Sequence, residues 1–480
     1  MLGIKNRVVN YNCPVYPLVL AMYMLKDDFY NIFGKRYYSQ GFISIYQKDL
    51  NNIFLLDNTA ENNAPYFTNQ VLNRKFLNNL EKNIKKKGED LRDFSNCFKR
   101  KNFRILSNKQ LLYLYKKFNK RYSGLYVWGW VPNAVDGHHD YFYTKLSNEF
   151  KALLSKKKLI NKFGQYFTIL TSSPSLSLRE IAAKDLLNIS KKSSREKLIN
   201  QYVDKYSWLT FNWSGPKYTK KDCHNDLKEI WRDKKHINEK ILYLRNKAKT
   251  VNSEKRQVIK DLRLSKKLQR QFDTLARLLY IKDLRKNILY QANYNASFLL
   301  KEVSRRLNLP LRFVYYILPD EMSNFIFKKE SVKKLIDRYE LTVLKFSVQK
   351  VECLSGKDAR IIAGKYLKTL VVSKSGFPLQ GQIASIGLAR GRVKIVNDSR
   401  DIHKVKPGDI LVSIKTDPTL LPAMKRAKAI VTEVGGITSH AAIVARELQV
   451  PCLIGVKNVS SILKDNQIIT VDANKGRICL

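Results

Sequence analysis

The chain has 480 residues, of which 44% are hydrophobic and 11% aromatic, a length and composition that predict more than one folded domain and exclude intrinsic disorder. Lysine and arginine total 88 against 41 aspartate and glutamate residues, which gives a formal net charge of +47. No stretch reaches the roughly 18 apolar residues needed to cross a bilayer, and the start lacks a signal-peptide cleavage pattern, so we expect a cytoplasmic protein.

The positive charge has two interpretations. A dedicated site for nucleic acid or another polyanion would gather lysine and arginine on one surface. Here the lysines are spread through the chain together with many asparagine, isoleucine and tyrosine residues, and most of the excess lies upstream of residue 378. This distribution favours solvated helix faces, and it leaves a basic polyanion-binding body as the alternative.

The six cysteines are scattered and form no Cys-x-x-Cys pair, and none has a histidine at zinc-finger spacing. Structural metal sites and disulfide scaffolds both need such spacings. We therefore expect no metal site and a reduced protein.

The first helical pattern runs from residue 107 to residue 185, where apolar residues recur at helical spacing in "LSNKQLLYLYKKFNKRYSGLYVW". The aromatic run Tyr126 to Trp130 followed by "DGHHDYFY" is compatible with a ligand pocket that uses His138 or His139, but aromatic side chains at this spacing favour a packed core. Serine and glutamate three residues apart, at Ser177 and Glu180, predict a helix start with a capping box.

A second capping pattern, Ser193 and Glu196, predicts another helix start. Residues 221 to 308 then contain no proline and alternate charged with apolar residues. This pattern indicates long antiparallel helices, without heptads regular enough for a coiled coil.

After residue 378 the periodicity changes. Short β-branched runs bounded by glycine, proline and aspartate predict strands within "GQIASIGLARGRVKIV", "GDILVSI", "KAIVTEV", "PCLIGV" and "QIITVDANKGRICL". Only "LLPAMKRA" and "SHAAIVAREL" have helical character among them. The last hundred residues are therefore a small α/β unit that follows a mainly α-helical body.

The candidate reactive site lies where a buried strand, residues 429 to 432, leads through Gly435 and Gly436 into a helix. The glycines allow positive φ and close approach of another group, and Thr438 or Ser439 can cap the helix so that its first-turn amides face an anion. His440 stands beside these amides. The positive helix end disfavours imidazolium and favours a bound phosphoryl group, so a phosphohistidine is the expected product.

The segment "GGITSHAAIVAR", residues 435 to 446, resembles the phosphorylation-site signature of the phosphoenolpyruvate-utilising enzymes, such as phosphoenolpyruvate synthase, pyruvate phosphate dikinase and rifampicin phosphotransferase. The resemblance covers about residues 378 to 480, the family's mobile or swivelling β/β/α domain. It implies that His440 is the phosphoacceptor, that Thr438 is the neighbouring hydroxyl, and that Gly435, Gly436 and Ser439 bind phosphate.

Weaker similarity extends upstream through "ANYNASFLLKEVSRRLNLPLRFVYYILPDEM" and "GKDARIIAG", which resemble the helical region that precedes the mobile domain in this family. The resemblance predicts a multidomain chain. Residues 1–175 form a helical N-terminal region, 176–372 a second helical region with long antiparallel helices, 373–380 a linker, and 381–480 the mobile phosphohistidine domain.

The family's other catalytic domains have no counterpart in this sequence. We find no Gly-rich phosphate loop, nothing similar to an ATP-grasp domain, and too little sequence after "PCLIG" for a phosphoenolpyruvate barrel. The resemblance then implies a phosphotransferase component that binds no cofactor tightly itself. ATP with Mg²⁺, or phosphoenolpyruvate, would act through a partner, a separately encoded ATP-grasp subunit, and a small molecule would be the acceptor.

Three arginines near the expected site have structural or surface roles in our interpretation. Arg446 follows His440 by six residues, which places it about 240° around the helix, so we expect a structural salt bridge for it and no direct contact with phosphate. Arg390 and Arg392 lie in a predicted hairpin, where they either meet an anionic ligand of a partner or face water, and we favour water.

Overall fold

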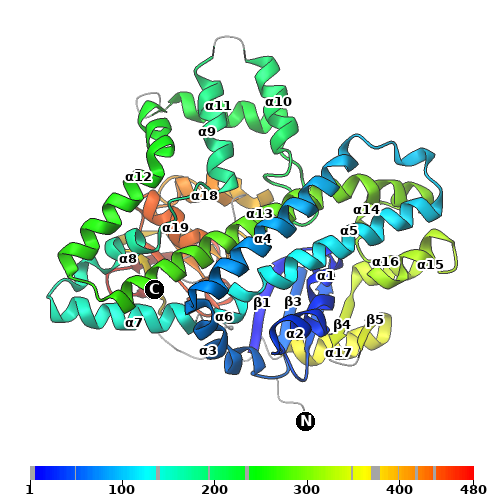
Figure 1. Ribbon diagram of the computed structural model, residues 1–480, viewed down its shortest axis with the longest axis horizontal. Helices are drawn as coiled ribbons and strands as arrows, with labels where there is room; N and C mark the ends of the chain where they lie inside the picture. The colour runs from blue at the N-terminus through cyan, green and yellow to red at the C-terminus, as the bar shows by residue number, and fades with distance from the viewer. Residues whose placement is uncertain are drawn as a thin grey trace. The chain divides into compact units, whose positions relative to one another are not determined.

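The computed structural model describes residues 6–48, 50–136, 141–192, 195–232, 237–347, 350–368, 379–397, 399–416, 420–435 and 439–479. The chain divides into two compact units, Met1–Gly364 and Lys365–Leu480. Helices dominate the first unit (Figure 1), and a seven-stranded sheet organises the second. The mainly helical character and the C-terminal α/β unit predicted from the sequence are both confirmed, whereas the finer boundaries at residues 175 and 372 stay predictions.

Helices account for most of the first unit. They are α1 (Val15–Lys26), α2 (Asp28–Phe33), α3 (Thr59–Leu72), α4 (Arg74–Asn96), α5 (Asn108–Gly129), α6 (Val131–Asp136), α7 (Tyr141–Lys156), α8 (Phe163–Thr171), α9 (Leu178–Ser190), α10 (Glu196–Tyr206), α11 (Lys220–Arg232), α12 (Ile237–Leu262), α13 (Lys266–Leu307), α14 (Leu311–Val314), α15 (Met322–Ile326), α16 (Lys333–Glu340) and α17 (Gly356–Lys368). The last of them runs across the boundary between the units.

The longest helix, α13, packs beside α4 and α5 (Figure 1). Both α4 and α5 bury one face, which in α4 consists of Leu77, Leu80, Ile84, Gly88 and Leu91 at three- and four-residue spacing. The long helices predicted between residues 221 and 308 are therefore present as α12 and α13. The antiparallel neighbour along which α13 packs is α5, from much earlier in the chain.

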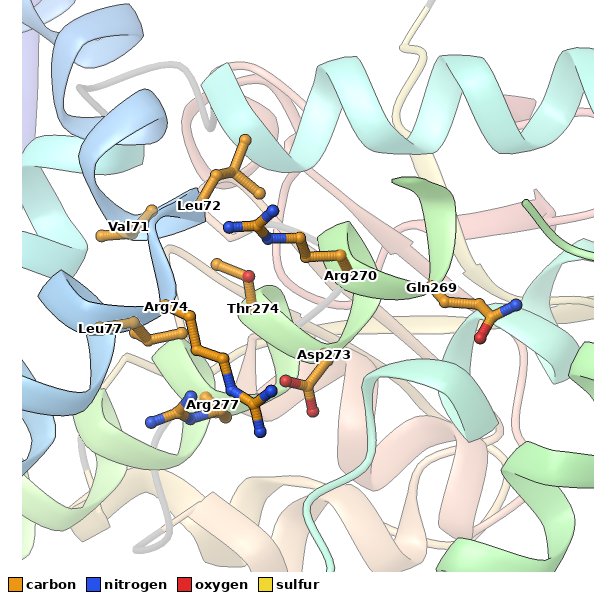
Figure 2. A pocket seen from close by; sticks show the side chains of 9 residues that line it. All are labelled: Val71, Leu72, Arg74, Leu77, Gln269, Arg270, Asp273, Thr274 and Arg277. Atoms are coloured by element: carbon orange, nitrogen blue, oxygen red, sulfur yellow. The ribbon is translucent and has the colours of Figure 1, made fainter. Parts of the chain in front are cut away.

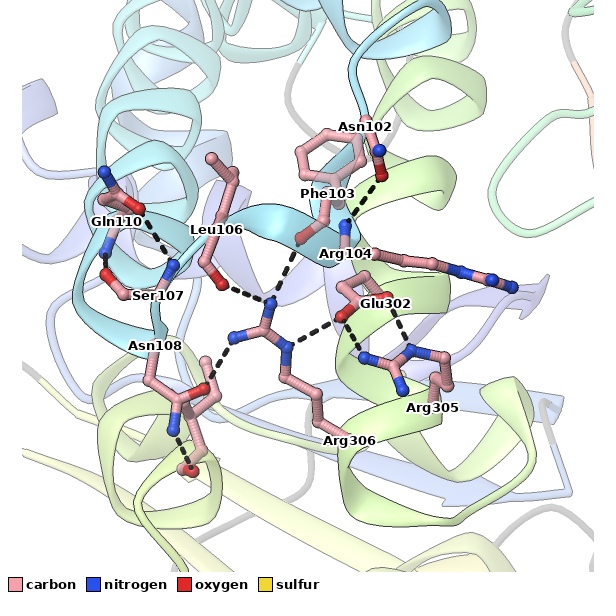
Figure 3. Close-up of polar contacts among 11 residues, drawn as sticks. Asn102, Phe103, Arg104, Leu106, Ser107, Asn108, Gln110, Glu302, Arg305 and Arg306 are labelled. Atoms are coloured by element: carbon pink, nitrogen blue, oxygen red, sulfur yellow. Dashed lines mark hydrogen bonds and ion pairs between the residues drawn. The ribbon is translucent and has the colours of Figure 1, made fainter.

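A buried ion-pair cluster joins the C-terminal end of α13 to the connection between α4 and α5 (Figure 3). Glu302, whose side chain is 6% exposed, accepts hydrogen bonds from Arg305 and Arg306 at 2.8 to 2.9 Å. Arg306 also donates to the Leu106 carbonyl and to Asn108 Oδ1, both at 2.6 Å. The hydrogen bonds from the arginines lower the pKa of Glu302 to about 2, so this carboxylate is ionised in the folded protein at neutral pH.

A five-stranded antiparallel sheet also belongs to the first unit, and the sequence analysis does not predict it. Its order is β1 (Asn6–Asn12), β3 (Leu50–Leu55), β2 (Phe42–Gln47), β4 (Thr342–Phe346), β5 (Val351–Ser355). The two halves of the sheet are separated by almost 300 residues of helical sequence, and β2 is buried along nearly its whole length. Because β2 lacks the alternation of a half-exposed strand, local pattern does not identify it.

The two predicted capping boxes have different outcomes. Ser177 Oγ accepts a hydrogen bond from the Glu180 amide at 3.1 Å, and the Glu180 carboxylate accepts one from the Ser177 amide at 2.8 Å, which confirms the first. Ser193 lies outside the described residues. The helix expected after it, α10, begins at Glu196.

The second unit contains one mixed sheet in the order β12-β11-β7-β8-β9-β10-β6. Its strands are β6 (Gln382–Ser385), β7 (Leu388–Ile395), β8 (Ile410–Ser413), β9 (Ala429–Thr432), β10 (Cys452–Ile454), β11 (Ile468–Asp472) and β12 (Arg477–Cys479), with helices α18 (Leu421–Arg426), α19 (His440–Glu447) and α20 (Val459–Ile462). Every strand and both helices predicted after residue 378 are confirmed. The short helix α20 was not predicted.

The centre of this sheet is parallel: β7 pairs with β8, β8 with β9, and β9 with β10, all in the same direction. Both β8 and β9 are fully buried, as expected for parallel strands covered on both faces. The predicted linker, residues 373–380, falls mostly outside the described residues. None of the described helices is long and apolar enough to span a bilayer.

Candidate functional site

The predicted site lies at the carboxyl end of the central parallel strand. β9 ends at Thr432, and the chain then enters α19, which begins at His440 and returns to the parallel neighbour β10. Loops at the carboxyl ends of parallel strands gather at one edge of the sheet, which is where open α/β sheets bind ligands. His440 therefore stands at the edge of the sheet where such a site is expected.

Gly435 gives the connection from β9 to α19 its shape. Its φ of +143° is a conformation that residues with a side chain rarely adopt. A Cβ at this position would lie 2.9 Å from Ser439 Oγ and 3.0 Å from Ser439 Cβ. The absence of a side chain at Gly435 is thus what lets the turn pass close to the residue that precedes His440.

Ser439 is the N-cap of α19. Its hydroxyl accepts a hydrogen bond from the Ala442 amide at 3.3 Å, so Ser439 is the capping residue among the two candidates. Thr438, the other candidate, lies outside the described residues together with Gly436. The cap satisfies one first-turn amide, and the positive end of the helix dipole remains directed toward the turn.

Hydrogen bonds hold the start of the turn in a fixed frame. The Glu433 amide donates to the Ser413 carbonyl at 3.0 Å, and the Val434 amide donates to the Ile414 carbonyl at 2.8 Å, so pairing with the β8 segment continues past the end of β9. The Glu433 carboxylate accepts hydrogen bonds from the amide and the hydroxyl of Ser460. Glu433 thereby ties the turn to α20, a role that sequence reasoning missed because the two residues are distant in the chain.

Thr432 is a further residue that sequence reasoning missed. It is fully buried, and its hydroxyl has no hydrogen-bond partner among the described residues. This oxygen lies 3.7 Å from the position that a Cβ on Gly435 would occupy. Because buried hydroxyls are nearly always hydrogen-bonded, Thr432 marks the floor of the glycine turn as a place suited to a polar group. The only sequence signal is a hydroxyl residue that ends a buried strand directly before the turn.

Small side chains let α19 lie close to the sheet. Ala441, Ala442 and Ala445 are at most 1% exposed, and the helix contacts β6, β9 and β10. Arg446 Nε donates to the Ala442 carbonyl at 2.8 Å, one turn earlier in the same helix. This contact is a hydrogen bond within the helix, and the salt bridge predicted for Arg446 stays a prediction.

Arg390 and Arg392 are exposed within the single strand β7, so the hairpin predicted at these residues is wrong. That they face water alone stays a prediction. Burial raises the pKa of the Cys452 thiol to about 12, although Arg446 lowers it in part, so the thiol stays protonated at neutral pH. Among the described residues, no group of three or more His, Cys, Asp or Glu side chains is arranged as a metal site.

The aromatic run of the first unit belongs to a packed core. Tyr126 is 3% exposed, and its ring contacts those of Tyr122 and Trp130 at centroid distances of 5.5 and 5.9 Å. This packing confirms the core interpretation of the run. His138 and His139, considered as ligands of a pocket there, lie outside the described residues.

The parallel core, the glycine turn and the capped helix together define an α/β domain that places the first residue of a helix at the edge of its sheet. Residues 405–476 match the family model described as "PEP-utilising enzyme, mobile domain". The second unit therefore contains a mobile domain of the phosphoenolpyruvate-utilising enzyme family.

Known proteins with related names are similar to part of this chain. The protein is 49% identical over 100 residues to a probable phosphoenolpyruvate synthase of Methanothermobacter thermautotrophicus and 52% identical over 100 residues to a phosphoenolpyruvate synthase of Pyrococcus furiosus. It is 45% identical over 98 residues to an uncharacterized phosphotransferase of Bacillus subtilis. Each match covers 20 to 21% of this chain and 12 to 15% of the relative.

Proposed function

We propose that the protein is a phosphotransferase component that carries a phosphoryl group on His440. The single observation that supports this most directly is the Gly435 turn, which passes so close to the helix cap beside His440 that a Cβ on Gly435 would lie 3.0 Å or less from Ser439, while the mobile-domain family model matches across it. A helix N-terminus favours an anion through its free amides and its dipole. The same arrangement suits a neutral imidazole that accepts a phosphoryl group and then holds it.

The proposed reaction consists of two phosphoryl transfers. In the first, an imidazole nitrogen of His440 attacks the phosphorus of a donor, an N–P bond forms, and the bond from phosphorus to the leaving oxygen breaks. In the second, an acceptor oxygen attacks the same phosphorus and the N–P bond breaks, which regenerates the imidazole. We propose Thr438 as the neighbouring hydroxyl and Gly435, Gly436 and Ser439 as the residues that surround the phosphoryl oxygens.

The donor site belongs to a partner in this proposal. ATP with Mg²⁺, held by a separately encoded ATP-grasp subunit, or phosphoenolpyruvate would supply the phosphoryl group, and a small molecule would receive it. Transfer between separate sites requires His440 to travel, and the segment around Gly376 and Pro378 has the composition of a linker that permits such movement.

A labelling experiment tests the proposal. The purified protein is incubated with phosphoenolpyruvate labelled in its phosphate, and separately with γ-labelled ATP and a candidate ATP-grasp partner. We expect a covalent label that is stable in alkali and lost in acid, as a phosphoramidate is, and that is absent from His440→Ala. His403→Ala serves as the matched control, because it removes another histidine of the same unit and should be labelled normally. A label that persists in His440→Ala, or wild-type protein that stays unlabelled with both donors, contradicts the proposal.

A further inference from the structure

A cavity of about 460 Å³ opens in the helical unit between the start of α13 and the junction of α3 with α4 (Figure 2). Its volume falls in the range of sites that hold small molecules. Its lining includes the apolar side chains of Val71, Leu72 and Leu77. It also includes three guanidinium groups, those of Arg74, Arg270 and Arg277.

Arg277 is already compensated by protein groups. Its Nε and Nη2 atoms donate to Glu81 Oε2 at 3.1 and 2.8 Å, and Nη2 also donates to Asn78 Oδ1 at 2.8 Å. Glu81 receives a further hydrogen bond from Lys85 at 2.7 Å. Arg277 is thus held in place as part of the wall.

Arg74 and Arg270 differ from Arg277, because neither guanidinium group has a hydrogen bond or an ion pair with any described residue. Both side chains are exposed, as is that of Asp273, the acidic residue of the lining. With Arg277 paired to Glu81, the lining carries two further arginines against one aspartate, so an excess of positive charge remains in the cavity.

A buried hydroxyl adds a directional group. Thr274 is 3% exposed and lines the cavity, and its hydroxyl forms no hydrogen bond with the described part of the chain. Helix α4 begins at Arg74, so the positive end of its dipole adds to the field at the same place. Charge, hydroxyl and dipole all favour an oxyanion.

We propose that this cavity is a binding site for a small phosphorylated molecule. The guanidinium groups of Arg74 and Arg270 bind the phosphate, as arginine commonly does. The Thr274 hydroxyl donates a hydrogen bond to a phosphate oxygen, and Val71 and Leu72 cover the carbon skeleton. The inference goes beyond the proposed function, because every residue involved belongs to the helical unit and none is part of the His440 turn.

Calorimetric titration of the full chain at constant ionic strength tests the site, with AMP, inorganic phosphate and succinate as probes. We expect saturable binding of AMP, weaker binding of inorganic phosphate, which lacks a carbon skeleton, and weaker binding of succinate. Arg270→Gln, Arg74→Gln and Thr274→Val should each weaken AMP binding, by tenfold or more for the arginine variants. Arg245→Gln, which removes an exposed arginine of α12 outside the lining, should leave it unchanged.

Further variants separate binding from folding and from phosphoryl transfer. Arg74→Lys and Arg270→Lys keep the charge and should retain more affinity than the glutamine variants, while circular dichroism checks that each variant is folded. His440→Ala should bind AMP as the wild type does. A failure of the labelling experiment would therefore leave the proposed phosphate-binding cavity to be judged by the titrations alone. No saturable binding of AMP, binding unchanged in the Arg74→Gln/Arg270→Gln double variant, or tighter binding of succinate than of AMP would each overturn the proposal.

Discussion

Replacement of Gly435 by alanine tests whether the turn positions the start of α19. The φ of +143° at this residue becomes strained once a Cβ is present. The added methyl would also lie 2.9 Å from Ser439 Oγ, a distance that real Cβ atoms essentially never show, and 3.0 Å from Ser439 Cβ. Either the turn or the cap must therefore shift, and both are adjacent to His440.

The magnitude follows from these two effects. Backbone strain of this kind costs about 1 to 3 kcal/mol, and a weakened N-cap adds about 1 kcal/mol. A displacement on the order of 1 Å at a reacting group can lower a rate by about 100-fold. We therefore expect Gly435→Ala to destabilise the C-terminal unit by about 2 to 4 kcal/mol and to slow labelling of His440 by about 100-fold.

Gly408 provides a matched control. Its φ is +96°, and a Cβ there would meet no atom within 4 Å. Gly408→Ala thus introduces backbone strain without the contact to Ser439, and it should lower stability while labelling stays near the wild-type rate. Stability is measured by urea unfolding, and labelling by the time course of phosphoryl incorporation. Equal labelling rates in the two variants would refute the claim that the turn positions His440.

Further predictions concern the cap, a buried thiol and the ion-pair cluster. Ser439→Ala should destabilise the C-terminal unit by about 1 kcal/mol in urea unfolding, and an unchanged midpoint would contradict its role as the cap. At pH 8 iodoacetamide should modify the exposed Cys97 in the native protein. Cys452 should react only after unfolding, because it is buried and its pKa is raised to about 12. Mass spectrometry of early time points detects the difference. Glu302→Gln should lower the free energy of unfolding by about 1 to 2 kcal/mol at pH 7. This is less than the whole pKa shift of Glu302 would correspond to, because solvent screens the ion pairs. Since the pKa of Glu302 is lowered to about 2, its contribution is complete above about pH 4.5 and is lost as the pH falls toward 2, where wild type and variant should converge in urea midpoint. Glu340→Gln, in an exposed pair, should cost less than about 0.5 kcal/mol throughout, and an equal cost for the two variants would contradict the importance of burial.

The C-terminal unit could be predicted from the sequence because its structure is local. Each strand after residue 378 is a short β-branched run with its own turn residues, and consecutive strands β7, β8, β9 and β10 are neighbours in the sheet. The glycine turn and the helix after it follow the same logic: Gly435 has the positive φ and Ser439 the capping bond that residue type suggested.

The parts that escaped prediction depend on pairing between distant segments. Strand β2 lies between β3, which follows it directly, and β4, which comes almost 300 residues later, and no local pattern encodes that choice of partner. The same is true of α13, whose neighbours α4 and α5 precede it by more than a hundred residues. Thr432 and Glu433 were missed for a related reason, since their significance comes from what surrounds them in space.

The length of α13 has a structural consequence. Its 42 residues form one uninterrupted helix, a rod roughly 60 Å long at 1.5 Å per residue, with the arginine-lined cavity near one end and the Glu302 cluster near the other. A single hydrogen-bonded helix therefore connects the α3–α4 junction with the α4–α5 connection as one continuous element.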